Sequence, residues 1–147
     1  ILQYMKEYAE KVGTLYGDVG SAEFDDNGLA LTRTFRPVDV AIVIDNLFSN
    51  AGKSGAKHVS FSCRRASTGG SVEIVVTDDG RGIDEAAVDA SKLFERGYSG
   101  SPRGSGLGLY HVKQVVEELG GSIGLDPERT AGAAAFIIRL PREGKAG

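Results

Sequence analysis

Two adjacent acids and two glycines follow an apolar segment near the middle of the chain. The run Asp78-Asp79-Gly80-Arg81-Gly82-Ile83 comes directly after residues 72–76, whose apolar composition predicts a strand. A carboxylate at the end of a buried strand requires a hydrogen-bond donor, and neighbouring glycines let a flat ligand approach the backbone closely. A planar heterocycle with an exocyclic amino group, such as adenine, meets both requirements. The same residue types also form ordinary turns.

Two asparagines lie four residues apart in an upstream segment with helical periodicity. Pro37 suits the first turn of a helix. An apolar stripe at three- and four-residue spacing follows it, formed by Val40, Val43, Ile44, Leu47, Phe48 and Ala51. Asn46 and Asn50 then share one flank of the helix, with Lys53 in its last turn. Amides on a helix flank are commonly just solvated, and a terminal lysine complements the helix dipole, so this segment alone assigns no function.

Glycines are concentrated in a third segment, at the start of a predicted helix. Gly104, Gly106 and Gly108 precede or begin an apolar helical pattern over residues 107–119. Backbone N–H groups at a helix N-terminus attract anions, and glycines leave room for a phosphate chain. The pattern differs from a dinucleotide-binding fingerprint because no strand immediately precedes it. Residues 95–105 are polar and glycine-rich, which is typical of a mobile functional loop or of a disordered connection.

The three segments, in this order and at this spacing, resemble the N, G1 and G2 boxes of the GHKL ATP-binding superfamily. Within it they resemble most the catalytic ATP-binding domain, HATPase_c, of bacterial sensor histidine kinases. Phe94-Glu95-Arg96-Gly97 resembles the F box of those kinases. The similarity covers residues 29–141. It implies a Bergerat-type α+β fold, a two-layer sandwich of a mixed sheet with helices on one face, and a flexible ATP lid over residues 95–105.

The resemblance also implies ATP and Mg²⁺ as cofactors and gives roles to individual residues. Asp78 would accept a hydrogen bond from the adenine amino group, and Gly82 would make room for the purine. Asn50 would bind Mg²⁺ through its side-chain oxygen, a ligand type that this cation favours. Lys53 would reach the phosphates as a point charge, so Asn50 and Lys53 are the expected catalytic residues. The expected nucleotide-binding residues are Asn46, Asn50, Lys53, Asp78, Gly80, Gly82, Ile83, Phe94, Arg96, Arg103, Gly104, Ser105, Gly106, Leu107 and Gly108.

The residue at position 46 bears on the type of reaction. In the family, several ATP-hydrolysing relatives and the anti-sigma-factor serine kinases carry a glutamate one turn before the Mg²⁺-binding asparagine, where it serves as a base. Here the position holds Asn46, a poor base, and the neighbouring Asp45 points about 100° away around the helix. An imidazole acceptor is itself nucleophilic and needs no such base. The sequence therefore favours transfer of the γ-phosphoryl group to a histidine.

Two alternative functions remain open. An anti-sigma-factor-type serine kinase fits the short chain, although Asn46 and the Phe94 region argue against it. A non-catalytic nucleotide-binding or interaction domain of the same superfamily is supported by two departures from the family pattern. Ser54 stands where an aromatic residue usually lies beside the purine, and Gly132 is followed by alanines where Gly-Thr is common.

The phosphoacceptor histidine is expected on a separate domain. The chain has two histidines, His58 at the start of a predicted strand and His111 inside a predicted helix, and both are interpreted as structural. We therefore predict two protein partners: a histidine-containing dimerisation domain that precedes residue 1 in the parent protein, and a response regulator. Residues 1–18 are expected to form an N-terminal helix that connects to the dimerisation domain, and residues 19–147 to form the catalytic domain.

Periodicity predicts the remaining elements. Apolar residues at helical spacing predict a helix over residues 1–16. Alternation predicts a strand over residues 58–65, and further strands are predicted over residues 71–77, 122–125 and 134–140. A hairpin is predicted from strands at residues 19–24 and 29–35 around the turn at residues 25–28, and a short helix over residues 84–90. Strands and helices do not alternate strictly, which favours a mixed sheet over a doubly wound parallel one.

Composition and charge restrict the class of protein and its partners. The 147 residues suffice for one domain with a core, and a net charge of −3 offers no basic surface for nucleic acid or membrane. The single Cys63 excludes an internal disulfide and a cysteine zinc cluster. No apolar run reaches the length of a membrane span, and no signal peptide is visible. We expect the domain to lie in the cytoplasm. This expectation includes the case in which the domain is the cytoplasmic part of a membrane-bound sensor.

Overall fold

The computed structural model describes residues 1–13, 20–31, 33–53, 55–66, 70–80, 94–95, 108–126 and 135–141. These ranges contain the helices α1 (Leu2–Gly13), α2 (Pro37–Lys53) and α3 (Gly108–Glu118). They also contain the strands β1 (Ser21–Asp25), β2 (His58–Arg65), β3 (Val72–Asp78), β4 (Ser122–Leu125) and β5 (Ala135–Leu140). The helix predicted over residues 84–90 lies outside the described residues.

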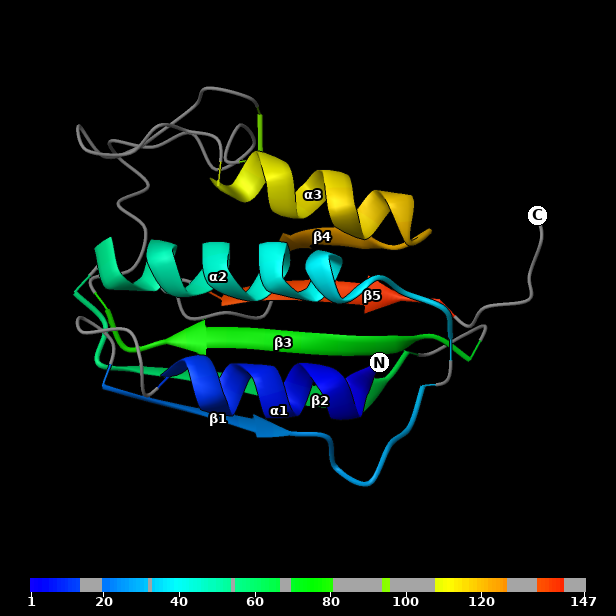
Figure 1. Cartoon of the computed structure of the whole chain (residues 1–147), viewed down its shortest axis with the longest axis horizontal. Coiled ribbons are helices and arrows are strands. Elements are labelled where there is room, and N and C mark those ends of the chain that lie inside the picture. The colour runs from blue at the N-terminus through cyan, green and yellow to red at the C-terminus, as the bar shows by residue number, and fades with distance from the viewer. Residues whose placement is uncertain are drawn as a thin grey trace.

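The strands form one mixed sheet in the order β1-β2-β3-β5-β4. β1 pairs with β2 in parallel, whereas the other pairs are antiparallel. The helices α1, α2 and α3 lie on one face of this sheet, with α2 between the other two (Figure 1). The arrangement confirms the predicted α+β sandwich, and it follows from the pattern of each element, because apolar strand faces and helix stripes must bury each other.

The core lies between the helices and the face of the sheet that they cover. On β2 the buried residues alternate as Val59, Phe61 and Cys63, so every second side chain points toward the helices. The apolar stripe predicted on α2 is buried throughout: Val40, Val43, Ile44, Leu47, Phe48 and Ala51. The rings of Phe48 and Phe61 lie 6.1 Å apart and join α2 to β2. Burial of each such side chain stabilises the fold by about 1.5–3 kcal/mol.

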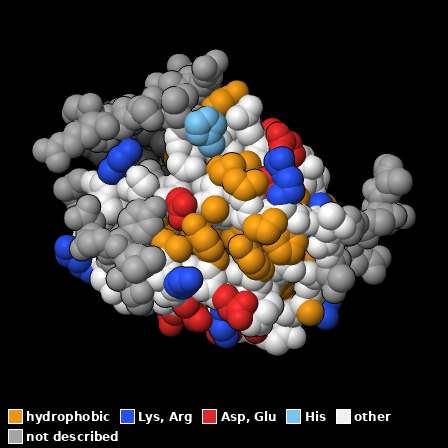
Figure 2. Space-filling model, in the orientation of Figure 1, with side chains coloured by type: hydrophobic (Ala, Val, Ile, Leu, Met, Phe, Trp, Pro, Cys, Tyr) orange, Lys and Arg blue, Asp and Glu red, His pale blue; other side chains and the backbone are white. Residues whose placement is uncertain are grey.

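Helix α1 belongs to the same core and carries aromatic residues on its outer side. Its buried side consists of Leu2, Met5, Ala9 and Val12. On the outer side, the Tyr4 ring lies 6.4 Å from that of Tyr8 and 5.4 Å from that of Phe35. Figure 2 shows hydrophobic side chains gathered over the helical layer on this face. The N-terminal helix predicted over residues 1–16 is thus observed as Leu2–Gly13.

The hairpin predicted around residues 25–28 is wrong. The turn itself forms, because Gly28 has a φ of +76° and its N–H donates to the side chain of Asp26 at 2.9 Å. However, β1 pairs in parallel with β2, and residues 29–31 and 33–36 contain no strand. Instead Leu31 is buried in the core. The turn residues encode a reversal of the chain, whereas the partner of β1 is set by burial against a strand more than 30 residues away.

A carboxylate lies between two guanidinium groups on the face of the sheet opposite to the helices. Arg64 of β2, Glu73 of β3 and Arg139 of β5 occupy one row of the strand register. The side chain of Glu73 is 10% exposed. It accepts hydrogen bonds from the guanidinium of Arg139 and, at 2.9 Å, from Arg64 Nε. These charge-assisted bonds hold the pKa of Glu73 below its usual value and tie three strands together.

Replacing Glu73 by glutamine is expected to lower the free energy of unfolding at neutral pH by about 1–2 kcal/mol, because charge-assisted bonds are lost. The folded-state pKa of Glu73 lies below the unfolded value of 4.5. Its contribution is therefore complete above that value and is lost as the pH falls through the folded-state pKa. Thermal unfolding of both proteins from neutral to strongly acidic pH measures this, and equal unfolding temperatures at neutral pH would contradict it.

Candidate functional site

Asp78 is the last residue of β3 and lies on the helix-covered face of the sheet. It follows the buried Ile74 and Val76 at two-residue spacing. Its Oδ1 accepts the Gly80 N–H at 2.8 Å, so the turn at the strand end orients the carboxylate. Burial raises the pKa of Asp78, the Gly80 hydrogen bond opposes the rise, and the charge of Asp79 adds to it. The half-buried carboxylate can accept a further hydrogen bond from a ligand.

The two flanks of α2 face different helices. Asp45 Oδ1 accepts a hydrogen bond from Tyr8 Oη at 2.9 Å, so this side chain faces α1. Asn46, about 100° further around the helix, faces α3: its Oδ1 would lie 3.1 Å from a Cβ added at Gly108. Asn46 Nδ2 also donates to the carbonyl of Ile42 at 2.7 Å. Asp45 therefore points away from the flank of α2 that carries Asn46 and Asn50.

Asn50 lies one turn beyond Asn46 on the same flank and is half-buried. Lys53 is the last residue of α2, and it is exposed. Among the described residues, no group of three His, Cys, Asp or Glu side chains lies close enough to bind a metal ion. The Asn50 amide oxygen is a hard ligand of the type that Mg²⁺ takes together with water and phosphate oxygens. This oxygen therefore fits a nucleotide-bound Mg²⁺ whose other ligands are water and phosphate oxygens.

Phe94 anchors the predicted F box to the sheet. Its ring meets the buried Phe136 of β5 edge-on, with centroids 5.9 Å apart, and packs at the edge of the core. Phe94 therefore packs on the core. Phe136 pairs with Val76 in the sheet, so Phe94 contacts the strand next to the one that ends at Asp78.

The predicted site residues that the structure describes gather at one end of the molecule. The end of β3, the C-terminal turns of α2 and the first residue of α3 all lie at the left end in Figure 1. Gly80 follows Asp78 there, and Gly108 begins α3 against Asn46. Eight other predicted residues lie outside the described part of the chain: Gly82, Ile83, Arg96, Arg103, Gly104, Ser105, Gly106 and Leu107.

The close approach of α2 and α3 at Gly108 can be tested by a pair of substitutions. A Cβ at Gly108 would crowd Asn46 Oδ1, and the bond that Asn46 Nδ2 donates to the Ile42 carbonyl holds this amide in place. Gly108→Ala is therefore expected to lower the free energy of unfolding by about 1 kcal/mol. Adding Asn46→Ala removes the crowding oxygen, so the double variant is expected to regain most of that loss. Additive losses in chemical denaturation would contradict the contact.

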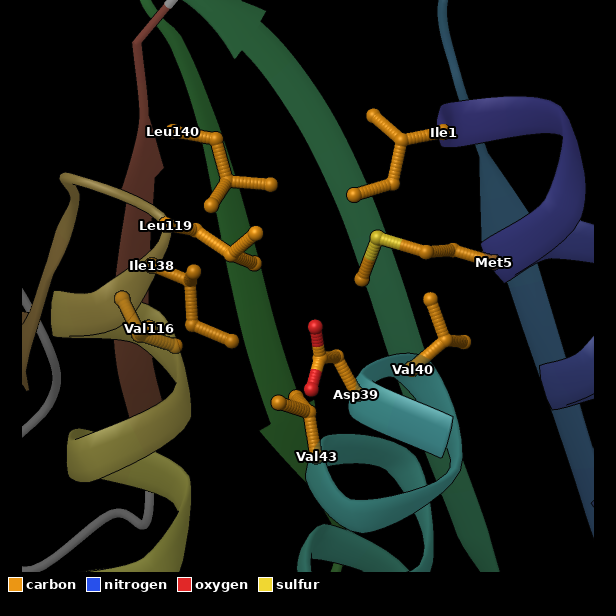
Figure 3. Close-up of a pocket in the computed structure, with 9 residues that line it drawn as sticks. All are labelled: Ile1, Met5, Asp39, Val40, Val43, Val116, Leu119, Ile138 and Leu140. Atoms are coloured by element: carbon orange, nitrogen blue, oxygen red, sulfur yellow. The ribbon is translucent and has the colours of Figure 1, made fainter. Parts of the chain in front are cut away.

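An apolar crevice at the other end of the helices does not belong to this site. Figure 3 shows the carboxylate of Asp39 surrounded by apolar side chains from α1, α2, α3 and β5. Asp39 is buried and is paired with both Nη2 and Nε of Arg36, at 2.9 and 3.3 Å. Asp39 and Asn50 are eleven positions apart on α2, about 17 Å along the helix axis. The charge of Asp39 is thus already neutralised, and the crevice offers a ligand only narrow apolar contacts.

The arrangement of these elements matches a known family of ATP-binding domains. Residues 36–144 match the family described as "Histidine kinase-, DNA gyrase B-, and HSP90-like ATPase". The chain belongs to this family. The match begins next to α2 and extends past β5, so this ATPase-type domain includes every segment from which the site was predicted. The predicted membership in the histidine kinase group is confirmed by the relatives and structures described next.

The relatives that match this chain include a sensor protein and several sensor histidine kinases. The chain is 37% identical over 105 residues to the sensor protein CitS of Bacillus subtilis, covering 71% of this chain and 18% of CitS. Two solved structures share the fold: the mycobacterial sensor histidine kinase MprB (29% identity, TM-score 0.67, 95% and 92% of the two chains) and the ATP-binding domain of PrrB from Mycobacterium tuberculosis (26%, 0.68, 96% and 93%). The chain thus spans about a fifth of the length of CitS and nearly all of these two solved domains.

Some features of this ATPase-type domain could not be inferred from its sequence. The Tyr8–Asp45 bond, the Glu73–Arg139 pair and the contact of Asn46 with Gly108 join residues far apart in the chain. For Glu73 there was one local signal, a charged residue near the start of a mostly apolar strand. Within the described residues, no helix is long and apolar enough to cross a membrane.

Proposed function

We propose that the domain binds Mg²⁺-ATP between the end of β3, the Asn46–Asn50 flank of α2 and the start of α3. The observation that supports this most strongly is the orientation of Asp78. Its half-buried carboxylate is fixed by Gly80 on the helix-covered face of the sheet, where it can accept the adenine amino group. Gly80, together with Gly82 and Ile83 of the same motif, would contact the purine.

The phosphates would lie toward the start of α3. Asn50 would bind Mg²⁺ through its amide oxygen, and Lys53 would place a positive charge near the phosphates. Mg²⁺ would neutralise phosphate charge as the phosphoryl group leaves. N–H groups at the N-terminus of α3 suit an anion, which supports a role for Gly104, Ser105, Gly106, Leu107 and Gly108 in cradling the triphosphate. Arg96 and Arg103 would add positive charge from the segment that precedes Gly104, and Phe94 would anchor the beginning of that segment.

We further propose that the γ-phosphoryl group passes to a histidine on a separate dimerisation domain and from there to a response regulator. The side chains on α2 support this choice of acceptor. Asn46 is a weak base, and the nearest acid on α2, Asp45, is bonded to Tyr8 on the other flank. An imidazole nitrogen attacks without a base, whereas serine or water needs one. In this account residues 1–18 connect to the dimerisation domain, and the domain works in the cytoplasm.

A transfer assay with γ-labelled ATP tests the acceptor. The domain is mixed with the dimerisation domain of the parent protein, and the labelled product is exposed to acid. The expected result is an acid-labile label on the dimerisation domain, as for phosphohistidine, and much less label with Asp78→Asn at the same low ATP concentration. Acid-stable label on an added protein would instead support a serine kinase. Nucleotide binding without any transfer would support an interaction domain.

A further inference from the structure

The second acid of the motif, Asp79, has a different set of partners from Asp78. Asp79 Oδ1 accepts two backbone hydrogen bonds from the start of β2, from the Lys57 N–H at 2.7 Å and from the His58 N–H at 3.0 Å. The Asp79 N–H in turn donates to the His58 carbonyl at 3.3 Å. The Asp79 side chain is exposed. The hydrogen bonds from His58 and Lys57 lower its pKa, so it is a stable anion at neutral pH.

The backbone that Asp79 holds is a junction of three strands. The carbonyl of Lys57 accepts the N–H groups of Gly20 and Ser21, at 2.9 and 3.1 Å, where β1 begins. Asp79 therefore connects the end of β3 through the start of β2 to the start of β1. This junction lies at the same end of the sheet as the nucleotide site proposed above (Figure 1).

The direction of Asp78 depends on this junction. Asp78 forms the last pair of the β2–β3 ladder, opposite Val59, and its Oδ1 is bonded to Gly80, two residues further on. The intervening Asp79 is the residue that fixes the path of the chain between these two points. If its side chain released the Lys57 and His58 N–H groups, the turn and the Asp78 carboxylate could rotate together.

We propose that Asp79 is a positioning residue that holds the Asp78 carboxylate toward the exocyclic amino group of adenine and thereby makes the site selective for adenine over guanine nucleotides. The proposal rests on the nucleotide site proposed above. Guanine presents a carbonyl oxygen where adenine presents its amino group, so a fixed carboxylate attracts one base and repels the other. A carboxylate that can rotate loses both effects.

Four proteins test this: wild type, Asp79→Ala, Asp79→Asn and Glu73→Ala. The dissociation constants of non-hydrolysable ATP and GTP analogues are measured by calorimetry. Asp79→Ala is expected to lower the preference for the ATP analogue about tenfold, because the Asp78 carboxylate is no longer held toward the adenine amino group. A tenfold change corresponds to the free energy of about one hydrogen bond. Asp79→Asn keeps an oxygen that accepts both N–H groups and is expected to retain the preference within about threefold. Glu73→Ala removes a strand-bridging carboxylate from the same sheet, so it should lower stability without changing the preference.

The outcomes separate this inference from the function on which it rests. Wild-type protein that binds neither analogue would contradict the nucleotide site itself. A wild type selective for ATP, with an equally selective Asp79→Ala variant, would overturn the positioning role alone, as would a loss in Asp79→Asn as large as in Asp79→Ala. If alanine prevents folding, Asp79→Ser, whose short side chain cannot span both N–H groups, is measured in its place against the same expectation.

Discussion

Asp78→Asn is expected to weaken nucleotide binding by about 10- to 150-fold while leaving the unliganded domain at least as stable as the wild type. The amide can still accept the Gly80 N–H through its oxygen, so the turn persists. Its NH₂ group, however, would face the adenine amino group, donor against donor. Loss of a hydrogen bond to a charged acceptor costs roughly 1.5–3 kcal/mol, equivalent to a loss in affinity of about 10- to 150-fold.

The expected gain in stability follows from the sign of the pKa shift. Burial raises the pKa of Asp78 above its usual value of 3.8, so ionised Asp78 is less favourable in the folded than in the unfolded chain. This cost begins as the pH rises through 3.8 and is complete above the folded-state pKa. Asparagine avoids it, so the unfolding temperature of Asp78→Asn should exceed that of wild type at neutral pH and approach it in strong acid.

Asp26→Asn is the matched control for Asp78→Asn. Asp26 Oδ1 accepts the Gly28 N–H at 2.9 Å, two residues along the chain, as Asp78 does with Gly80. Asp26→Asn therefore makes the same change from carboxylate to amide in a turn of the same kind, but outside the proposed site. Calorimetry should find wild-type affinity in Asp26→Asn. Equal losses of affinity in both variants would contradict a specific contact of Asp78 with the base.

Asn50→Ala is expected to remove most of the effect of Mg²⁺ on binding and to reduce phosphoryl transfer by about 100-fold or more, because charge neutralisation and alignment supply most of the catalysis in such reactions. Affinity for the nucleotide without Mg²⁺ should change little, since Asn50 is proposed to act through the metal ion. The two quantities are measured by calorimetry with and without Mg²⁺ and by the transfer assay with labelled ATP.

Ser49→Ala is the matched control on the same helix. Ser49 lies next to Asn50 in sequence and one turn beyond Asp45, on the flank that faces α1. Its replacement should leave both Mg²⁺ dependence and transfer at the wild-type level. An Asn50→Ala variant that binds ATP with undiminished Mg²⁺ dependence would place the metal ligand elsewhere in the chain.

The elements that sequence patterns predicted well are those with complete local signals. Helix α2 has Pro37 at its start, an unbroken apolar stripe, and Gly55 with a φ of +76° just after its end. β2 was predicted with its observed bounds because three of its residues alternate cleanly into the core. The hairpin failed because turn residues specify a local reversal but carry no information about which distant strand pairs with β1.

The sequence predicted which motifs contribute to the candidate site but not how these motifs are arranged in space. The resemblance of the three ordered segments to the GHKL superfamily implied a nucleotide site, whereas the composition around Asp78 and the spacing of Asn46 and Asn50 did not do so alone. No local pattern indicated that Asp79 would hold the start of β2 or that Asn46 would meet Gly108, because both contacts depend on how separate elements pack. Contacts of this kind follow from the assembled fold and are invisible in a single motif.

Calorimetric titration of the wild-type domain with a non-hydrolysable ATP analogue, with and without Mg²⁺, tests the central claim most directly. We expect saturable binding of one nucleotide per chain and a higher affinity when Mg²⁺ is present. Absence of binding by correctly folded protein would contradict the account and leave the fold without its proposed nucleotide site.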